Sequence, residues 1–233
     1  PAAHAVINPN RLDETSPHRN LAAVGVAFLL AVATNRALRQ AGWYDAARPE
    51  PDLMQWLDLV ALGTICDMVP LTGLNRALVV QGLKVMAQRR NRGLSALADI
   101  ARVAEPPGTF HAGFLFGPRV NAGGRIGASD LGTRLLSTED AAEAAMLAEK
   151  LDFLNAERRA IEASVLDQAL RQVEAMQVES GGDLPPFVLL AGEGWHPGVI
   201  GIVASRVLER VHRPVFIVGL NGESGKGSGR SLR

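Results

Sequence analysis

The spacing of apolar residues predicts a mainly helical first part of the chain. An apolar run over residues 21–40 predicts a helix, and Gly42 stands where a C-terminal cap is expected. Because the run is apolar nearly all round, we expect this helix to be packed on most of its faces. Similar patterns predict further helices, over residues 52–63, 75–89 and 94–103. A short buried strand is expected before them, at residues 5–8.

The second part of the chain has a different pattern. Residues 138–176 contain neither Pro nor Gly and predict one helix of about 55 Å. This exceeds the usual length of a globular helix, so we expect it to connect two lobes. After a linker at residues 180–186 come the segments FVLLAG, GVIGIVASRVLERV and PVFIVGL. They predict a βαβ unit with parallel strands and a right-handed crossover.

Composition narrows the class of protein. Of the 233 residues 47% are hydrophobic and 21% are charged, which excludes intrinsic disorder and predicts one large domain or two modest ones. The net charge is zero, so nothing global indicates a nucleic-acid or membrane partner, although a local basic patch remains open. The longest apolar run is shorter than the ~20 residues that cross a bilayer. With no signal peptide and a single cysteine, a soluble cytoplasmic protein without a membrane partner is expected.

Asp67 is the first candidate for chemistry. It follows a buried helical stretch and lies between the apolar residues Cys66 and Met68. A carboxylate at such a place either caps backbone N–H groups or binds a divalent cation such as Mg²⁺ or Mn²⁺, which prefer oxygen ligands. The residue types favour the cap, and a single Asp cannot build a metal site.

Residues 117–125, GPRVNAGGR, are the second candidate. The segment is too polar for a core element, so we expect a loop whose glycines let backbone N–H groups face an anion. Arg119 and Arg125 would supply forked donors for phosphate oxygens. The alternative is a surface loop whose arginines are solvated or pair with the acidic long helix. Asn121 between the two arginines favours anion binding.

Two more glycine-rich segments lie near the C-terminus. Residues 192–201, GEGWHPGVIG, cover a strand-to-helix turn, where unpaired N–H groups can bind an anion. There His196 is either a phosphate ligand or structural, and Trp195 either stacks on a base or caps the core. Residues 225–231, GKGSGRS, are dense in phosphate donors, although their composition favours a flexible tail. Neither segment has the dinucleotide or P-loop spacing.

Together, these segments resemble a known family. ALGTICDMVPL, GPRVNAGGRIG, GWHPGVIGIVASR and GSGRS are similar, in this order, to motifs of the RecJ-type single-strand-specific DNA exonucleases of the DHH phosphoesterase superfamily. The resemblance runs over nearly all of the chain and implies an α/β fold. Residues 1–134 would form the C-terminal part of a DHH-type parallel-sheet domain. Residues 135–183 would be the long connecting helix and linker, and residues 184–233 the start of a smaller DHH-associated domain.

The resemblance also implies roles for individual residues. Asp67 matches an aspartate that helps to hold the catalytic divalent metals, Mn²⁺ or Mg²⁺. Arg119, Asn121 and Arg125 match a segment at the substrate cleft, where the arginines would neutralise the DNA backbone close to the metals and Arg125 would take part in catalysis. Cys66 stands where the family pattern has Ala, and this change removes no functional group.

For the second lobe the resemblance implies substrate-binding residues. His196 and Gly198 match a turn that faces the cleft, and Ser228 and Arg230 match a segment that binds the DNA backbone or its 5′ end. The family's run of alternating aspartates and its Asp-His-His motif are absent from the sequence. Two-metal hydrolysis needs several ligands around both ions, so we expect this chain to be an inactive fragment when alone.

The implied function of the intact protein is 5′-to-3′ hydrolysis of single-stranded DNA in repair and recombination, with replication or repair proteins as possible partners. One alternative is a non-catalytic relative that binds single strands or scaffolds a replication complex. Another is a phosphodiesterase of the same superfamily that acts on short oligonucleotides or cyclic dinucleotides. A nicotinamide-dependent enzyme is the least supported class, because the βαβ unit lacks the glycine spacing.

Overall fold

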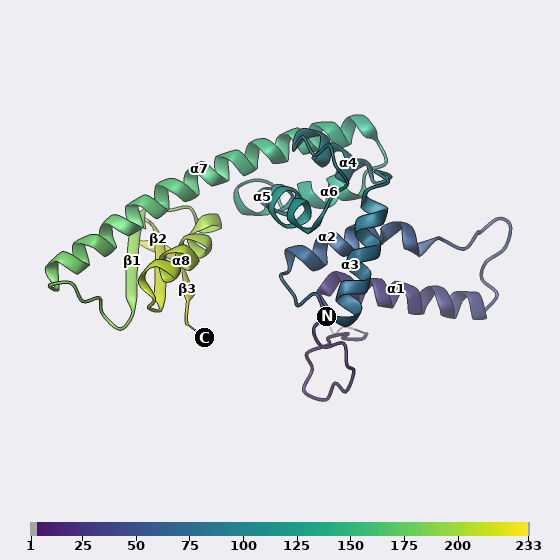
Figure 1. The fold of residues 1–233 in the computed structure, drawn as a ribbon, viewed down its shortest axis with the longest axis horizontal. Helices are drawn as coiled ribbons and strands as arrows, with labels where there is room; N and C mark the ends of the chain where they lie inside the picture. The colour runs from purple at the N-terminus through teal and green to yellow at the C-terminus, as the bar shows by residue number, and fades with distance from the viewer. Residues whose placement is uncertain (1–3, 233) are drawn as a thin grey trace. The chain divides into compact units, whose positions relative to one another are not determined.

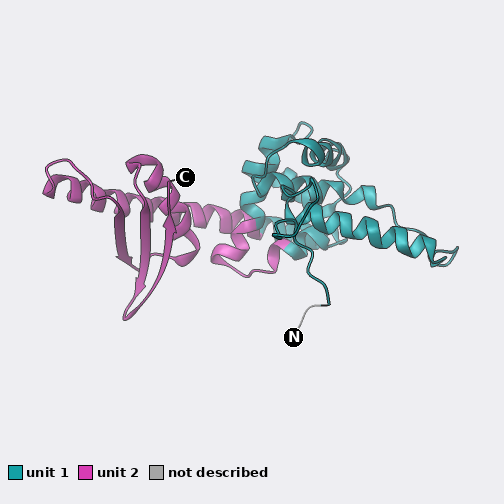
Figure 2. Ribbon diagram, turned by 90° about the horizontal axis from the view of Figure 1, so that it is seen from below, with its two compact units in different colours: residues 1–120, 133–149 teal, residues 121–132, 150–233 magenta. Residues whose placement is uncertain are grey.

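The chain forms two compact units in the computed structural model, which describes residues 4–232. Unit 1 comprises residues 1–120 and 133–149, and unit 2 comprises residues 121–132 and 150–233. Figure 2 shows the two units in different colours, with one long helix contributing to both. The three-part division into DHH-type domain, connecting helix and DHH-associated domain stays a prediction.

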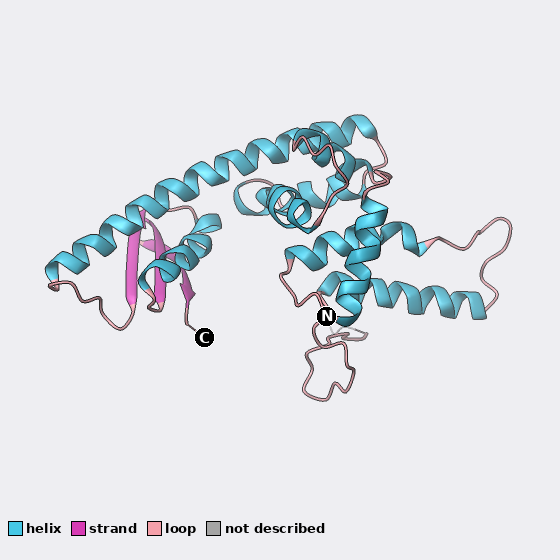
Figure 3. Cartoon of the chain, in the orientation of Figure 1, coloured by secondary structure: helices cyan, strands magenta, loops and turns pink. Residues whose placement is uncertain are grey.

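Helices make up the regular structure of the described part of unit 1 (Figures 1 and 3). They are α1 (Ala23–Gln40), the 3₁₀ turn η1 (Leu53–Trp56), α2 (Leu57–Cys66), α3 (Gly73–Met86), α4 (Arg92–Ile100), the π-helical turn η2 (His111–Phe116) and the first part of α5 (Gly117–Ile126). Helix α6 (Leu131–Ser137) and the start of α7 (Ala141–Glu179) follow. The four helices predicted for this part of the chain are present, with ends shifted by a few residues.

The core of unit 1 forms around α2. This helix is apolar on all sides, and Leu57, Val60 and Ile65 are buried. A Cβ atom at Gly82 of α3 would overlap the backbone carbonyl of Leu57, so the two helices approach with their backbones in contact. Glycine at this position therefore permits the close packing of α3 against the first turn of α2.

Two expectations for the N-terminal part are wrong. Residues 5–8 form no strand, and Val6 and Ile7 are 64% and 57% exposed. A strand needs a hydrogen-bonded neighbour, and no described strand pairs with this segment. Helix α1 is not packed on most of its faces either, because Gly25 and Asn35 are its only buried residues and α2 is its principal neighbour.

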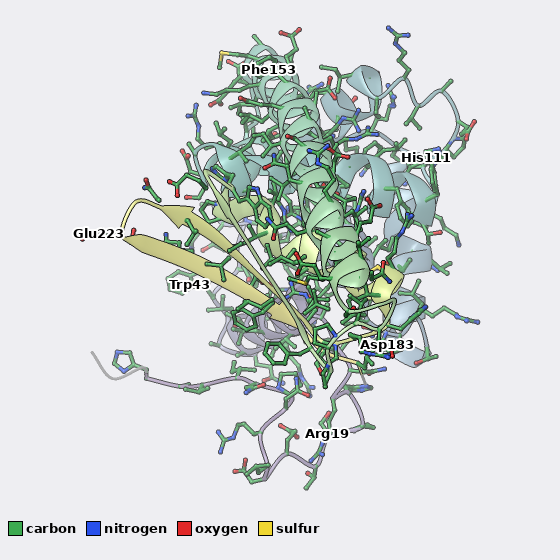
Figure 4. All side chains as sticks on the ribbon, turned by 90° about the vertical axis from the view of Figure 1, so that its left-hand side faces the viewer. Arg19, Trp43, His111, Phe153, Asp183 and Glu223 are labelled. Carbon is green, nitrogen blue, oxygen red and sulfur yellow. The ribbon has the colours of Figure 1, made fainter. Side chains whose placement is uncertain are left out.

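Unit 2 holds the predicted βαβ unit. The strands β1 (Val188–Glu193) and β2 (Val215–Asn221) are parallel, with Val188 opposite Val215, and α8 (Pro197–Val211) connects them. A third strand, β3 (Ser224–Arg230), is antiparallel to β2, and Glu223 lies at the tip of the hairpin between them (Figure 4). The expected flexible tail at residues 225–231 is therefore wrong for residues 225–230, which form a strand.

The long helix α7 covers one face of this mixed sheet together with α8. Val165 and Ala169 of α7 are buried in the same cluster as Leu190, Ile217 and the apolar face of α8. Side-chain hydrogen bonds reinforce the contact, since Gln172 exchanges two bonds with the backbone of Ala191, at 2.7 and 3.3 Å. Within the described residues, no helix has the length and apolar character needed to cross a membrane.

Candidate nucleic-acid interface

Strand alternation sorts the residues of β3 onto two faces. Successive side chains of a strand point to opposite sides. Gly227 and Gly229 face outward, where added Cβ atoms would approach the ring of Phe216 closely. Ser228 and Arg230 face the other side, toward α8. The alternation of glycine with polar residues, which resembles a flexible tail in composition, thus presents the polar groups together on the helix-covered face.

Ser228 and Arg230 converge on Gly201 of α8. A Cβ atom at Gly201 would lie 3.1 Å from Nη2 of Arg230 and 3.1 Å from Oγ of Ser228. The Nη1 group of Arg230 donates to the carbonyl of Gly229 at 2.7 Å and to the hydroxyl of Ser228 at 3.3 Å. Among the described residues no hydrogen bond occupies Nη2. A cationic donor and a hydroxyl therefore flank a position that lacks a side chain.

The start of α8 is built by His196 and Pro197. The ring Nδ1 of His196 accepts a hydrogen bond from the backbone N–H of Gly198 at 3.0 Å, so this side chain is the N-cap. Pro197 suits the first helical position because its nitrogen has no hydrogen to leave unpaired. Since Nδ1 is an acceptor, the neutral ring carries its proton on Nε2, which has no hydrogen-bond partner among the described residues.

Trp195 caps the core and does not present its ring for base stacking. It is 3% exposed, and its indole N–H donates to Oε1 of Gln168 at 3.0 Å. Beside it, a groove of ≈ 410 Å³ opens at the carboxyl ends of β1 and β2, and His196 and Lys226 are among its lining residues. Ligands of open α/β sheets commonly bind at this edge, in front of a helix N-terminus.

Arg125 lies against the start of α8. Its Nη1 group donates to the carbonyl of Gly198 at 3.3 Å, and a Cβ atom at Gly198 would overlap the carbonyl oxygen of Arg125. The structure therefore brings together two residues that sequence reasoning assigned to separate segments. The side chain of Arg125 is exposed, so its charge is available to an anion in front of the helix.

A buried ion pair on α7 also connects this helix to α8. Glu162 is 3% exposed and pairs with Arg158 on the same helix at 2.5 Å and with Arg206 of α8 at 2.7 Å. Burial lowers the pKa of Arg158, and the positive charge of Arg125 acts in the same direction, whereas Glu162 opposes the shift. Glu162 therefore joins α7 to α8 through Arg206, and the charge of Arg125 is close enough to act on this ion pair.

The segment predicted as a glycine–arginine loop is a helix. Residues 117–126 form α5, so the nest of free backbone N–H groups expected there is absent. Its glycines serve close packing instead: a Cβ atom at Gly117 would overlap the thiol of Cys66, and one at Gly123 would lie 3.3 Å from Leu151. Tertiary contacts of this kind override the weak helix propensity of glycine.

The two other polar residues of α5 have different surroundings. Arg119 is partly buried, and its Nη1 group donates to the carbonyl of Leu115 at 2.8 Å. Asn121 is exposed. Because Gly117 packs on Cys66 within unit 1, the segments that carry Arg119 and Asp67 lie next to each other.

Asp67 follows α2 as its C-terminal cap residue, with an exposed side chain. The favoured interpretation, capping of backbone N–H groups by this carboxylate, is wrong: unpaired groups at a helix C-terminus are carbonyls, and the carboxylate receives no hydrogen bond from the described residues. Met68 then adopts φ +56°, a left-handed conformation that is uncommon outside glycine. Next to Asp67, burial raises the pKa of the Cys66 thiol, as expected for a small core residue.

The described residues contain no group of three or more His, Cys, Asp or Glu side chains that could hold a metal ion. Asp67 alone supplies too few donors for one divalent cation, let alone two. The donor set of this chain therefore does not fit a complete metal centre, and Asp67 can contribute only one ligand to it.

Two residues of this region escaped the sequence reasoning as binding groups. Gly201 lets β3 approach α8 closely and Ser205 bonds Arg230, and neither was named as a binding residue from the sequence. Gly201 and Ser205 are four residues apart, and this spacing places them on one face of a helix. Only the register of α8 against β3 shows that this face meets Arg230.

Fold and site together define a class of protein. Unit 2 carries a helix N-terminus in its βαβ unit together with Arg125, Lys226 and the pair Ser228–Arg230, which are donors of the kind that anions such as phosphates accept hydrogen bonds from. A second unit carries an exposed carboxylate on a rigid helix end. The donors of unit 2 define the class only as far as a protein that can bind anionic ligands.

Comparison with known proteins identifies the family concerned. The whole chain is 44% identical to part of the single-stranded-DNA-specific exonuclease RecJ of Dickeya dadantii and 43% identical to that of Escherichia coli, and it spans 41% of the length of each. A crystal structure of RecJ from Thermus thermophilus with Mg²⁺ superimposes with a TM-score of 0.73 at 40% identity, over 89% of this chain and 30% of that one. No protein-family profile matches the chain. The resemblance to RecJ-type exonucleases is thus confirmed, and the chain corresponds from end to end to a segment of them.

Proposed function

We propose that the protein carrying this chain is a metal-dependent exonuclease that digests single-stranded DNA from the 5′ end in repair and recombination. The similarity of the whole chain to a segment of RecJ proteins supports this assignment, and crystal structures of such proteins contain Mg²⁺ or Mn²⁺. Within that enzyme, the chain supplies groups that bind the DNA strand and one ligand of the metal centre.

The observation that carries the proposal is the convergence of donors at Gly201. Nη2 of Arg230 and the hydroxyl of Ser228 both lie 3.1 Å from the position that a Cβ atom would fill there. A phosphate of the DNA backbone would accept hydrogen bonds from both groups and neutralise the guanidinium. Such a contact positions a strand without reading its bases, as an enzyme with no sequence preference requires.

Residues at the α5–α8 contact would add further contacts to the DNA strand. Arg125 would neutralise a phosphate near the reacting bond, and Nε2–H of His196 would donate to the strand in front of α8, where the helix dipole also favours an anion. Gly198 permits the approach of the two helices, since any side chain there would separate them. Arg119 and Asn121 of α5 would also contact the substrate, as the resemblance implies.

Asp67 would be a metal ligand. A carboxylate next to the free carbonyls of a helix C-terminus is electrostatically unfavourable, and a bound cation would remove the conflict. When bound, the divalent ions activate water and stabilise charge that develops on the scissile phosphate. Because the described residues provide only one such ligand, this chain alone should bind DNA without cleaving it.

We also propose the predicted domain roles. Residues 1–134 would belong to the metal-binding domain, residues 135–183 would connect, and residues 184–233 would begin the substrate-binding domain. Single-stranded DNA would be the partner, and a DNA substrate supports the expected cytoplasmic location. Contacts with replication or repair proteins remain a part of this proposal.

End-labelled substrates test the proposal in the full-length protein. With Mn²⁺ or Mg²⁺, single-stranded DNA labelled at its 5′ end should release the label at once, while 3′-labelled DNA should shorten progressively and duplex DNA should persist. Preferential turnover of dinucleotides would instead support the oligonucleotide phosphodiesterase. Tight binding without cleavage would support the non-catalytic relative.

A further inference from the structure

Ser205 lies between the backbone of α8 and the guanidinium of Arg230. Its hydroxyl donates to the carbonyl of Gly201, one turn earlier in the helix, at 3.2 Å. The same oxygen accepts a hydrogen bond from Nε of Arg230 at 3.1 Å. Because the hydroxyl proton is directed at Gly201, the lone pairs of the oxygen are free to face Arg230.

This contact determines which part of the guanidinium remains available. Nε is bound to Ser205, and Nη1 is bound to Gly229 and Ser228. Nη2 makes no hydrogen bond among the described residues and lies 3.1 Å from the position that a Cβ atom of Gly201 would occupy. The three bonds thus orient the planar group so that one nitrogen, next to the Ser228 hydroxyl, faces the proposed phosphate position.

An arginine on an exposed strand whose side chain is not held in place loses conformational entropy when it binds a ligand. Its long side chain samples many rotamers, and part of this freedom is lost when a ligand fixes it. A side chain that is already held in the binding orientation loses less, and binds more tightly without any new contact to the ligand.

We propose that Ser205 is a positioning residue, which pre-orients Arg230 for a phosphate of the DNA strand. The inference rests on the proposed phosphate contact of Arg230. Ser205 itself does not touch the strand, and it acts only through the arginine. Its effect must therefore vanish when Arg230 is absent.

A double-mutant cycle in the full-length protein tests this coupling. Binding of a fluorescently labelled single-stranded oligonucleotide is measured by anisotropy without added divalent metal, so that no DNA is cleaved. Arg230→Ala should raise Kd by roughly 10- to 100-fold and Ser205→Ala by roughly 5-fold, in line with the loss of hydrogen bonds to a charged group. Ser205→Ala should have no further effect in the Arg230→Ala background.

Two matched variants control for helix structure. Ser205→Thr keeps the hydroxyl and should bind DNA like the unmodified protein. Ser137→Ala removes an equivalent hydroxyl bond to a carbonyl one turn earlier, that of Thr133 at 2.8 Å, and should change nothing. Circular dichroism melting confirms that each variant is folded.

The outcomes separate the two hypotheses. If Arg230→Ala leaves binding unchanged, the phosphate contact is wrong and the positioning role is wrong with it. If Arg230→Ala weakens binding while Ser205→Ala does not, or if the two effects add, the positioning role alone is overturned. Loss of binding in Ser205→Thr equal to that in Ser205→Ala would also overturn it.

Discussion

The carbonyl oxygen of Arg125 occupies the space where a side chain of Gly198 would be. The contact joins the end of α5 to the first turn of α8 within unit 2, and the Arg125 side chain reaches back to the carbonyl of Gly198. Two motifs far apart in the sequence can therefore pack this closely only because residue 198 has no Cβ atom. The position of Arg125 in front of the helix N-terminus depends on that absence.

Gly198→Ala should separate these helices. The added methyl group would force a backbone shift, at a cost of about 1–3 kcal/mol in the free energy of unfolding, and DNA binding should weaken as Arg125 moves. Gly124→Ala is the control, because a Cβ atom there meets no atom within 4 Å and alanine favours the helix. Thermal melting and anisotropy of both variants check the prediction. Equal melting temperatures would contradict it.

Arg230→Ala should reduce the salt dependence of DNA binding. Each phosphate that a cation neutralises releases counterions, so the slope of log K against log [salt] should become less steep by about 0.7 for a single strand. Arg213→Ala provides a control, since that exposed arginine lies in the same unit and bonds only the adjacent His212 carbonyl among the described residues. If the slope of log K against log [salt] is unchanged in both variants, residue 230 makes no phosphate contact.

The pattern of the sequence predicted the regular elements but not the glycine-rich ones. The absence of Pro and Gly over a long stretch predicted α7, and two short apolar runs on either side of a helical pattern predicted the βαβ unit. Strand β3 escaped prediction, since its glycines carry no strand signal. It forms because β2 offers an open edge and Phe216 covers Gly227 and Gly229 on the outer face. Likewise, α5 is helical through its contacts with Cys66 and Leu151, which sequence alone cannot reveal.

The candidate site was predictable in its residue types rather than in its geometry. Ser228 and Arg230 stood out as donors, but their shared orientation comes from strand alternation. Ser205 did not stand out, because its spacing from Gly201 becomes informative only when the neighbouring strand is placed against α8. The resemblance to RecJ proteins supplied the roles that neither composition nor periodicity could.

Asp67→Ala should abolish metal-dependent cleavage by the full-length protein and leave its fold intact. Since the carboxylate lies at a helix C-terminus, its removal relieves an unfavourable charge and should leave the melting temperature unchanged or slightly higher. Asp45→Ala is the control: this carboxylate also lies in unit 1, pairs with Arg48 at the surface and should be dispensable. Cleavage assays with Mn²⁺ check the outcome, and normal turnover by the Asp67 variant would exclude a ligand role.

Glu162→Gln should destabilise the protein strongly. The carboxylate is buried between Arg158 and Arg206, and its neutralisation leaves the mostly buried guanidinium of Arg158 without its charge partner, at a cost of about 3 kcal/mol. The pair Asp167–Arg171 has the same helical spacing on α7 but is exposed. Asp167→Asn should therefore change the unfolding free energy by less than about 1 kcal/mol. Denaturant titrations of the two variants measure the contrast, and similar losses in both would refute it.

Asp58→Asn should stabilise the protein and alter its response to pH. Asp58 is 2% exposed in α2, and burial raises the pKa of its carboxyl group, opposed only in part by hydrogen bonds from backbone N–H groups such as that of Leu59. A carboxyl whose pKa is higher in the folded state binds more protons there, so stability falls as the pH rises from about 4, the unfolded pKa, through the folded pKa. Asparagine keeps an acceptor for the Leu59 N–H and carries no charge. Melting curves across this pH range should show a decline for the parent protein that is smaller in Asp58→Asn, and parallel curves would show that Asp58 is not its source.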